Sequence, residues 1–224
     1  MIQWVYERAR RSSARQVIVA TDDERIAAVV RELGGEAALT SAAHASGTDR
    51  IAEVARRERW DDGDIVVNLQ GDEPLMPAAL LDQVAALFDQ YAAADLTTLC
   101  VPLESVAVLL DPNVVKVVVD AHQRALYFSR APIPWSRDGA HDGLQRSFAG
   151  AQRHLGLYAY RVASLLRLAA LPPSPLEQIE KLEQLRALEQ AMDIRVARAA
   201  VAPGADVNTA QDLSAVAALL QAGR

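Results

Sequence analysis

The stretch Asp64-Ile65-Val66-Val67-Asn68-Leu69-Gln70-Gly71-Asp72-Glu73-Pro74 joins a short apolar run to a polar turn. The apolar half has the composition of a buried strand, and the polar half follows at its carboxyl end, where open α/β sheets bind ligands. Gly71 lets the backbone turn or approach a ligand, and Asp72 and Glu73 add two carboxylates, which suit a hard cation such as Mg²⁺. A polar turn leading into a helix near Pro77 explains the same pattern equally well.

Similar apolar runs alternate with helical patterns on both sides of this stretch. Residues 16–21 and 96–101 have the composition of strands, whereas residues 23–33 and 48–59 carry apolar side chains at the spacings of three and four that indicate helices. Apolar strands separated by helices predict a sheet covered on both faces. We therefore expect a doubly wound α/β fold with a mostly parallel sheet.

The middle of the chain has a different pattern. Residues 114–119, 125–129 and 154–160 are strand-like, with no helix of useful length between them. We expect a small antiparallel β insertion at about residues 111–161 of a single domain spanning residues 1–224.

The loop at residues 131–151 belongs to this insertion and contains the apolar sequence Pro132-Ile133-Pro134-Trp135. It either folds over its own core or forms a pairing surface for a second copy of the chain, and the sequence favours neither.

The two ends of the chain are mostly helical. Pro172-Pro173-Ser174-Pro175 predicts the start of a helix at residues 176–192, whose carboxylates would by default form a solvated face. A strand at residues 194–199 and a helix from Thr209 follow. At the other end, a helical pattern over residues 2–12 precedes the first strand.

That helix-first order is unusual, because doubly wound nucleotide folds begin with a central strand and a phosphate-binding loop. Neither GxGxxG nor GxxxxGK[ST] occurs in the chain. We expect that a strand and its loop are missing, so that the strands at residues 17–20 and 64–69 flank an unfilled central position.

Composition excludes several functions. The net charge of −6 argues against a nucleic-acid-binding protein, which needs a basic face. Met1 to Arg15 contains four arginines but no apolar block of signal-peptide length, and no apolar run is long enough to span a membrane. The single Cys100, in an apolar run, predicts a buried thiol in a reducing compartment. We expect a cytoplasmic protein without nucleic-acid or membrane partners.

Two further motifs carry polar groups that could bind a ligand. In His44-Ala45-Ser46-Gly47-Thr48-Asp49-Arg50, Ser46 and Thr48 are good helix N-caps, and a helix N-terminus suits anionic or acceptor groups. An ordinary capped helix accounts for the same residues.

The second motif is Arg153-His154-Leu155-Gly156-Leu157-Tyr158-Ala159-Tyr160. Alternation places His154, Gly156, Tyr158 and Tyr160 on one face of a strand and the leucines on the other. Such a face could bind a hydroxylated acid, although a lone histidine there is more often structural.

Taken together and in order, the motifs resemble those of one family, the 3-deoxy-manno-octulosonate cytidylyltransferases (CMP-KDO synthetases). The resemblance extends from Ile2 to about Leu219 and is carried by TDD (21–23), HASGTDR (44–50), NLQGDEP (68–74), DPNVVKVV (111–118), ALYFSRAPIPW (125–135), RHLGLYAYR (153–161) and SPLEQIEKLEQLR (174–186). The combination QGDEP, SRAPIPW and RHLGLYAYR distinguishes it from the related sialic-acid cytidylyltransferases.

The resemblance implies a nucleotidyltransferase-type sheet, and an enzyme that joins CTP to the acid sugar KDO, giving CMP-KDO and pyrophosphate for lipopolysaccharide synthesis. It further implies Mg²⁺ as cofactor and a homodimer. The residues that it places in the site are Asp72 for the metal; His44, Ser46, Gly47, Thr48 and Arg50 for CTP; and Gln70, Arg130, His154, Tyr158, Glu183 and Gln184 for KDO. Arg130 is the expected partner of the sugar carboxylate, because a guanidinium matches a carboxylate two-pronged.

The chain departs from the family pattern in two places. The opening strand and the loop that bears Arg and Lys for the β- and γ-phosphates have no counterpart, so the chain as printed is expected to bind CTP poorly and react slowly. Near the C-terminus, Asp206-Val207-Asn208-Thr209 stands where relatives read Val-Asp-Thr.

This second departure leaves the second metal ligand open between Asp206 and Asn208. We expect the Asn208 side-chain oxygen to point toward Asp72, with Asp206 close behind on the same face. Alternatively, Asn208 only caps the helix that follows.

Two other functions are compatible with the motifs: a cytidylyltransferase for another acid sugar, and a non-catalytic family member that binds or scaffolds.

Overall fold

The computed structural model of the protein describes residues 1–44, 46–137, 148–207 and 209–222. Its helices are α1 (Ile2–Ala9), α2 (Glu24–Glu32), α3 (Gly47–Glu58), α4 (Ala78–Gln90), α5 (Val106–Leu110), α6 (Val162–Ala169), α7 (Pro175–Glu180), α8 (Gln184–Glu189) and α9 (Ala210–Ala222). Its strands are β1 (Ile18–Thr21), β2 (Glu36–Leu39), β3 (Ile65–Asn68), β4 (Leu96–Pro102), β5 (Lys116–Val119), β6 (Ala125–Ser129), β7 (Gln152–Arg161) and β8 (Ile194–Arg198).

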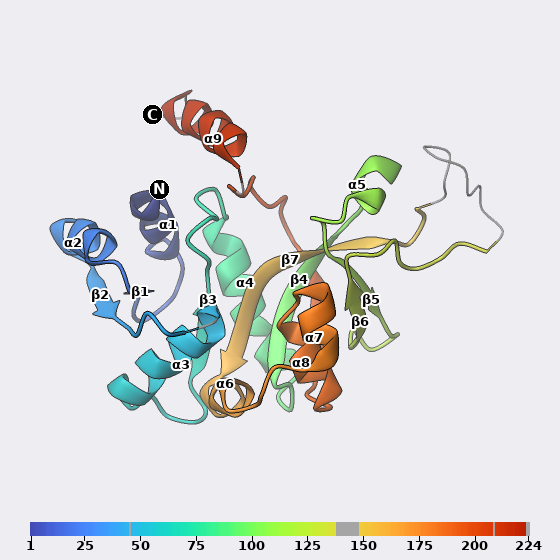
Figure 1. Ribbon diagram of the computed structural model, residues 1–224, viewed down its shortest axis with the longest axis horizontal. Coiled ribbons are helices and arrows are strands. Elements are labelled where there is room, and N and C mark those ends of the chain that lie inside the picture. The colour runs from blue at the N-terminus through green and yellow to red at the C-terminus, as the bar shows by residue number, and fades with distance from the viewer. Residues whose placement is uncertain (45, 138–147, 208, 223–224) are drawn as a thin grey trace.

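The strands form two sheets (Figure 1). β1 and β2 pair in parallel, and the larger sheet has the order β6-β5-β7-β4-β8, with β3 also paired to β7. β3, β4 and β8 run in one direction, whereas β7 runs antiparallel to β3, β4 and β5. The expected α/β class is confirmed, as are the antiparallel strands in the middle of the chain.

β7 organises the larger sheet because it is long enough to have two neighbours along one edge. β4 pairs with it from Gln152 to Tyr160. On the opposite edge, β5 pairs only with its first two residues and β3 only with Tyr158 to Arg161. The carboxyl end of β3 and the start of β5 therefore lie one after the other along β7, separated by a short length of that strand.

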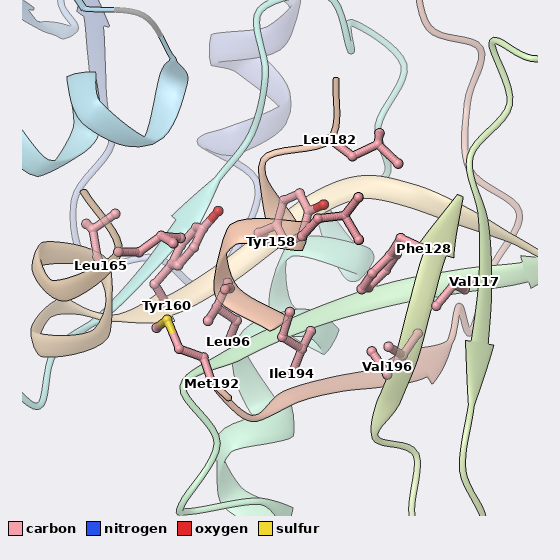
Figure 2. Packing of buried hydrophobic residues seen from close by; sticks show 14 of the residues in the cluster. Leu96, Val117, Phe128, Tyr158, Tyr160, Leu165, Leu182, Met192, Ile194 and Val196 are labelled. Carbon is pink, nitrogen blue, oxygen red and sulfur yellow. The ribbon is translucent and has the colours of Figure 1, made fainter. Parts of the chain in front are cut away.

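The two faces of the larger sheet bury separate apolar clusters. On one face α4 contributes Leu80, Val84 and Phe88 against Leu155 and Leu157 of β7. On the other face, shown in Figure 2, Tyr158 and Tyr160 of β7 pack with side chains that include Leu96, Leu165, Leu185 and Ile194. The leucines and the tyrosines of β7 thus lie on opposite faces, as predicted.

The strands expected to flank an unfilled position are β1 and β3. In the described part of the chain β1 pairs with β2 and β3 pairs with β7, and the two are not hydrogen-bonded to one another. This agrees with the expected separation of the two strands, and the unfilled position itself stays a prediction. β2 was not predicted, because Glu36–Leu39 is short and partly exposed and contains no β-branched residue.

The helix predicted at residues 176–192 is wrong, because two short helices, α7 and α8, occupy that segment. Lys181 ends α7 in the left-handed conformation, with a φ of 55°. The turn buries Leu182, and α8 then buries Leu185. Burial of these leucines outweighs the helical periodicity of the sequence.

Among the described residues, no helix combines the length and the apolar composition needed to cross a lipid bilayer.

Candidate active site

A polar site lies where β3 ends beside β7. The Gln70 side chain follows the β3 tip and lies next to Gly156, since a Cβ at Gly156 would be 3.8 Å from Gln70 Nε2. Gly47, in the first turn of α3, lies equally close to Asn68 Nδ2. The β3 tip therefore lies between the start of α3 and the middle of β7.

The carboxylates of the site come from two segments far apart in sequence. Val207 N donates a hydrogen bond to Asp72 O over 2.9 Å, which holds the segment before α9 against the β3 turn. Gly204 permits this approach, because a Cβ there would lie 2.3 Å from Leu75 Cβ and 2.4 Å from Leu75 O. Asp206 thereby comes close to Asp72, whereas Asn208 lies outside the described residues.

The pKa of Glu73 reflects its burial and the neighbouring carboxylates. Burial, followed by the charges of Asp206 and Asp72, raises the pKa of Glu73 to about 7, against a smaller opposing effect of Arg153. Negative charge from Asp206 and Asp72 therefore acts at Glu73.

A cation of the Mg²⁺ type fits such a donor set. Within the described segments, no three His, Cys, Asp or Glu side chains gather closely enough to hold a metal by themselves. Mg²⁺ usually takes one or two carboxylates and completes its shell with water and substrate phosphates, which Asp72 and Asp206 could satisfy.

The start of α3 carries a second polar cluster, centred on Glu183. Ser46 caps the helix by accepting a hydrogen bond from Asp49 N and also donates to Glu183 Oε1 over 2.7 Å. Thr48 Oγ1 donates to Glu183 Oε2 over 2.7 Å. Burial raises the pKa of Glu183, and the two hydroxyls partly offset that effect. The capping role of Ser46 is confirmed, and the helix N-terminus already holds a carboxylate.

His44 and Arg50 make contacts away from Glu183. Arg50 donates to Thr40 Oγ1 over 2.6 Å and lies 3.3 Å from Asp22, so it joins the segments that follow β1 and β2. His44 Nε2 lies 2.5 Å from Glu53 Oε2, on the side of α3. Both side chains border the edge at which β1 and β2 end.

His154 is buried in the face of β7 predicted to bind a ligand. Its Nε2 lies 2.9 Å from Thr98 Oγ1, and its ring packs edge-on against Phe128 and next to Tyr158. Burial, and secondarily the charge of Arg153, lowers the pKa of His154 to about 3. The imidazole is therefore neutral near pH 7, and it is a hydrogen-bonding group but not an effective base.

Tyr158 is also buried at this site, and Gln184 is buried at the start of α8. Burial raises the pKa of Tyr158 well above its ordinary value, so its hydroxyl remains protonated. The structure thus brings Gln70, His154 and Tyr158 together along β7 as neutral polar groups.

Arg130 follows β6 and is held on several sides. Its Nε donates to Glu180 O and its Nη1 to Pro112 O, while its main-chain N donates to Glu180 Oε2. The buried Lys116 Nζ donates to Arg130 O, Val114 O and Asp111 O. These contacts fix the orientation of the guanidinium.

The acidic residues between 177 and 183 do not form the solvated face expected by default. Glu177 makes a two-pronged ion pair with the buried Arg186, at 2.8 and 2.5 Å. Glu180 accepts hydrogen bonds from Ser129 and Arg130, and Glu183 from Ser46 and Thr48. The break at Lys181 separates these carboxylates and turns each toward a different partner.

Sequence reasoning gave no role to Thr98 or Lys116, although both make buried contacts here. The only available signal was a polar side chain within an otherwise apolar strand. That signal does not reveal the partner.

Comparisons with known proteins show the family to which the chain belongs. The cytidylyltransferase family matches residues 1–194. The 3-deoxy-manno-octulosonate cytidylyltransferase of Thioalkalivibrio sulfidiphilus is 52% identical over 222 residues, covering 99% of this chain and 89% of the relative. The enzyme of the same name from Halorhodospira halophila is 51% identical over 227 residues, covering 100% and 88%.

Solved structures are similar as well. A CMP:2-keto-3-deoxy-manno-octonic acid synthetase complexed with CTP has a TM-score of 0.88 and 39% identity, and covers 100% of this chain and 88% of the other. A 4-diphosphocytidyl-2C-methyl-D-erythritol synthase shares the fold alone, with a TM-score of 0.60 and 11% identity over 98% of this chain and 89% of the other.

Proposed function

This chain belongs to the 3-deoxy-manno-octulosonate cytidylyltransferase family, and we propose that it joins CTP to KDO, releasing pyrophosphate. One observation carries the proposal. A group of carboxylates, Asp72, Glu73 and Asp206, lies next to a neutral polar face formed by Gln70, His154 and Tyr158. The carboxylates suit a cation with a triphosphate, and the neutral face suits a polyhydroxylated sugar.

In the reaction, a sugar hydroxyl oxygen forms a bond to the α-phosphorus of CTP. The bond from that phosphorus to the oxygen bridging the α- and β-phosphates breaks, and pyrophosphate leaves. Catalysis of such a transfer consists mainly of positioning and charge neutralisation. A neutral His154 with a pKa of about 3 would orient the sugar, and the hydroxyl proton would pass to solvent.

Mg²⁺ would be held by Asp72 and Asp206 and would supply neutralisation of the triphosphate charge. Without a cation, the carboxylates would repel CTP, since the neighbouring charges of Asp206 and Asp72 already raise the pKa of Glu73. Asn208, the third predicted ligand, stays a prediction from the sequence.

The acid sugar would lie along β7, with its carboxylate at Arg130. The contacts from Arg130 Nε and Nη1 to main-chain oxygens orient the guanidinium plane, so that a carboxylate can approach the other end of the group. Ser46, Gly47 and Thr48 would lie along the cytidine, as the resemblance implies. Since Glu183 already accepts from both hydroxyls there, a neutral hydroxyl or amine fits this position better than a phosphate.

The test is pyrophosphate release by the full-length gene product from CTP with KDO, compared with CTP and sialic acid. We expect release with KDO and Mg²⁺ and essentially none with sialic acid. The reverse preference would assign the enzyme to another acid sugar, and no release with either would favour a binding role.

Asp72→Asn tests the metal site in the same assay. The variant should lose at least about a hundredfold in turnover, the order of magnitude that a lost charge-stabilising group costs, and keep its unfolding midpoint. Asp82→Asn is a matched control, because Asp82 lies in α4 and accepts hydrogen bonds from Ser13 instead of taking part in the proposed metal site. Normal turnover of Asp72→Asn at saturating Mg²⁺ would exclude the proposed role.

A homodimer is the proposed assembly. Trp135 is 61% exposed and Leu126, of β6, is 59% exposed, so the β5–β6 region presents large apolar side chains. Sedimentation equilibrium of the protein should give twice the chain mass, and Trp135→Glu should shift it toward the monomer. A cytoplasmic location and a place in lipopolysaccharide synthesis stay predictions from the sequence.

A further inference from the structure

Thr98 is a fully buried residue of β4 whose hydroxyl meets three groups of β7. Its Oγ1 lies 2.8 Å from Leu157 O, 3.2 Å from Leu155 O and 2.9 Å from His154 Nε2. The register of β4 against β7 shifts between Thr98 and Leu99, and this irregularity explains how two carbonyl oxygens of one strand reach a single hydroxyl.

The Thr98 hydroxyl can donate its hydrogen bond only to the carbonyl oxygens. A threonine hydroxyl has one proton and two acceptor lone pairs, whereas a carbonyl oxygen can only accept. If the proton pointed at His154 Nε2, the hydroxyl oxygen and Leu157 O would face each other at 2.8 Å with no proton between them. The hydroxyl therefore donates to the carbonyl oxygens and accepts from His154 Nε2–H.

This hydrogen-bond direction determines whether the other ring nitrogen, Nδ1, carries a proton. A neutral imidazole carries one proton, so a protonated Nε2 leaves Nδ1 as a bare acceptor. In the described part of the chain no residue hydrogen-bonds Nδ1. Among the described residues, Asp193 Oδ1 is the only side-chain polar atom that is both fully enclosed and without a hydrogen bond, and it lies 3.2 Å from Arg124 Nε. Because His154 Nδ1 has no hydrogen bond and is not such an atom, it still reaches solvent.

We infer that Thr98 is a positioning residue that holds His154 as the Nε2–H tautomer, so that Nδ1 accepts a hydrogen bond from a hydroxyl group of the sugar. The ligand part of this inference rests on the proposed function. Two side chains then bind different groups of the sugar. Arg130 binds the carboxylate, and His154 Nδ1, which repels a carboxylate, accepts from a hydroxyl.

The tautomer can be measured directly on the free full-length protein by ¹⁵N NMR of the histidine rings. His154 is assigned by comparison with His154→Gln. We expect Nε2 to be proton-bearing and Nδ1 to be bare at pH 7. A proton on Nδ1 would overturn the inference, whatever the enzyme does with KDO.

Variants of Thr98 test the consequence for binding. Thr98→Val removes the hydroxyl at nearly constant volume and should allow the proton to occupy both ring nitrogens. The KM for KDO should rise roughly three- to tenfold, as expected for the loss of one oriented hydrogen bond, with the KM for CTP unchanged. Thr98→Ser keeps the hydroxyl and should restore both the tautomer and the KM for KDO.

Thr97→Val is the matched control. Thr97 is equally buried in the same strand, but its hydroxyl donates to Val84 O of α4, on the opposite face of the sheet. The Thr97→Val variant should lower the unfolding midpoint about as much as Thr98→Val, with no change in the His154 tautomer or in the KM for KDO. An equal rise in the KM for KDO in both valine variants would reduce Thr98 to a structural role. Absence of pyrophosphate release together with the Nε2–H tautomer would instead contradict only the proposed function.

Discussion

His154 makes the folded protein sensitive to acid, because a buried imidazole cannot be charged without cost. Its pKa is about 3 in the folded protein and about 6.5 in an unfolded chain. Between these two values the unfolded chain binds a proton at this residue and the folded chain does not. The contribution to stability is therefore complete above about pH 6.5 and is lost progressively as the pH falls toward 3.

This linkage predicts that the free energy of unfolding falls by about 2 kcal/mol more in the wild type than in His154→Gln between pH 7 and pH 5. Urea unfolding at pH 7, 6 and 5 measures the difference. Carboxylates titrate in both proteins, so the comparison isolates the histidine. If the free energies of unfolding of the wild type and of His154→Gln fell equally with pH, His154 would be protonated in the folded state over this range.

At the scale of elements, the break between α7 and α8 brings Glu183 to the start of α3. Lys181 forms this break with a φ of 55°, a conformation that glycine adopts without strain. Lys181→Gly should therefore stabilise the protein by about 0.5–1 kcal/mol. Gln178→Gly, within α7, should destabilise it by about 1 kcal/mol. Unfolding midpoints of the two variants should move in opposite directions, and a destabilised Lys181→Gly would contradict the account.

Gly204 allows the segment that carries Asp206 to approach the turn that carries Asp72. A methyl group at this position would lie 2.3–2.4 Å from Cβ and O of Leu75, so the segment carrying Asp206 must move away from Asp72. Gly204→Ala should raise the Mg²⁺ concentration needed for half-maximal turnover severalfold and lower stability by about 1–3 kcal/mol. Gly63→Ala, where a Cβ has open space, should change neither. An unchanged Mg²⁺ requirement in Gly204→Ala would argue against a role for Asp206.

The alternation of strands and helices was predictable wherever the apolar pattern was long, as in α3, β4 and the two faces of β7. The break at Lys181 was not, because it depends on leucines buried against α-helices distant in sequence. The face of β7 on which His154 lies was predictable from alternation. Its partner Thr98 was not, because the contact depends on a local shift in register.

At the scale of the whole molecule, the site is assembled from segments that are far apart in sequence. The contact from Thr48 to Glu183 joins residues 135 apart, and the bond from Val207 to Asp72 joins the segment before α9 to the end of β3. No local pattern predicts such pairings. The resemblance to the family predicted which residues share the site, and the structure places Gln70 next to Gly156 and brings Ser46 and Thr48 to Glu183.

In the proposed reaction a sugar hydroxyl, oriented by uncharged side chains, attacks the α-phosphorus of CTP. The most direct test is ³¹P NMR of the full-length protein with CTP, KDO and Mg²⁺ at pH 7. We expect equal amounts of pyrophosphate and of a phosphodiester joining CMP to the sugar. Pyrophosphate accompanied by free CMP from the start of the reaction would show attack by water and contradict it.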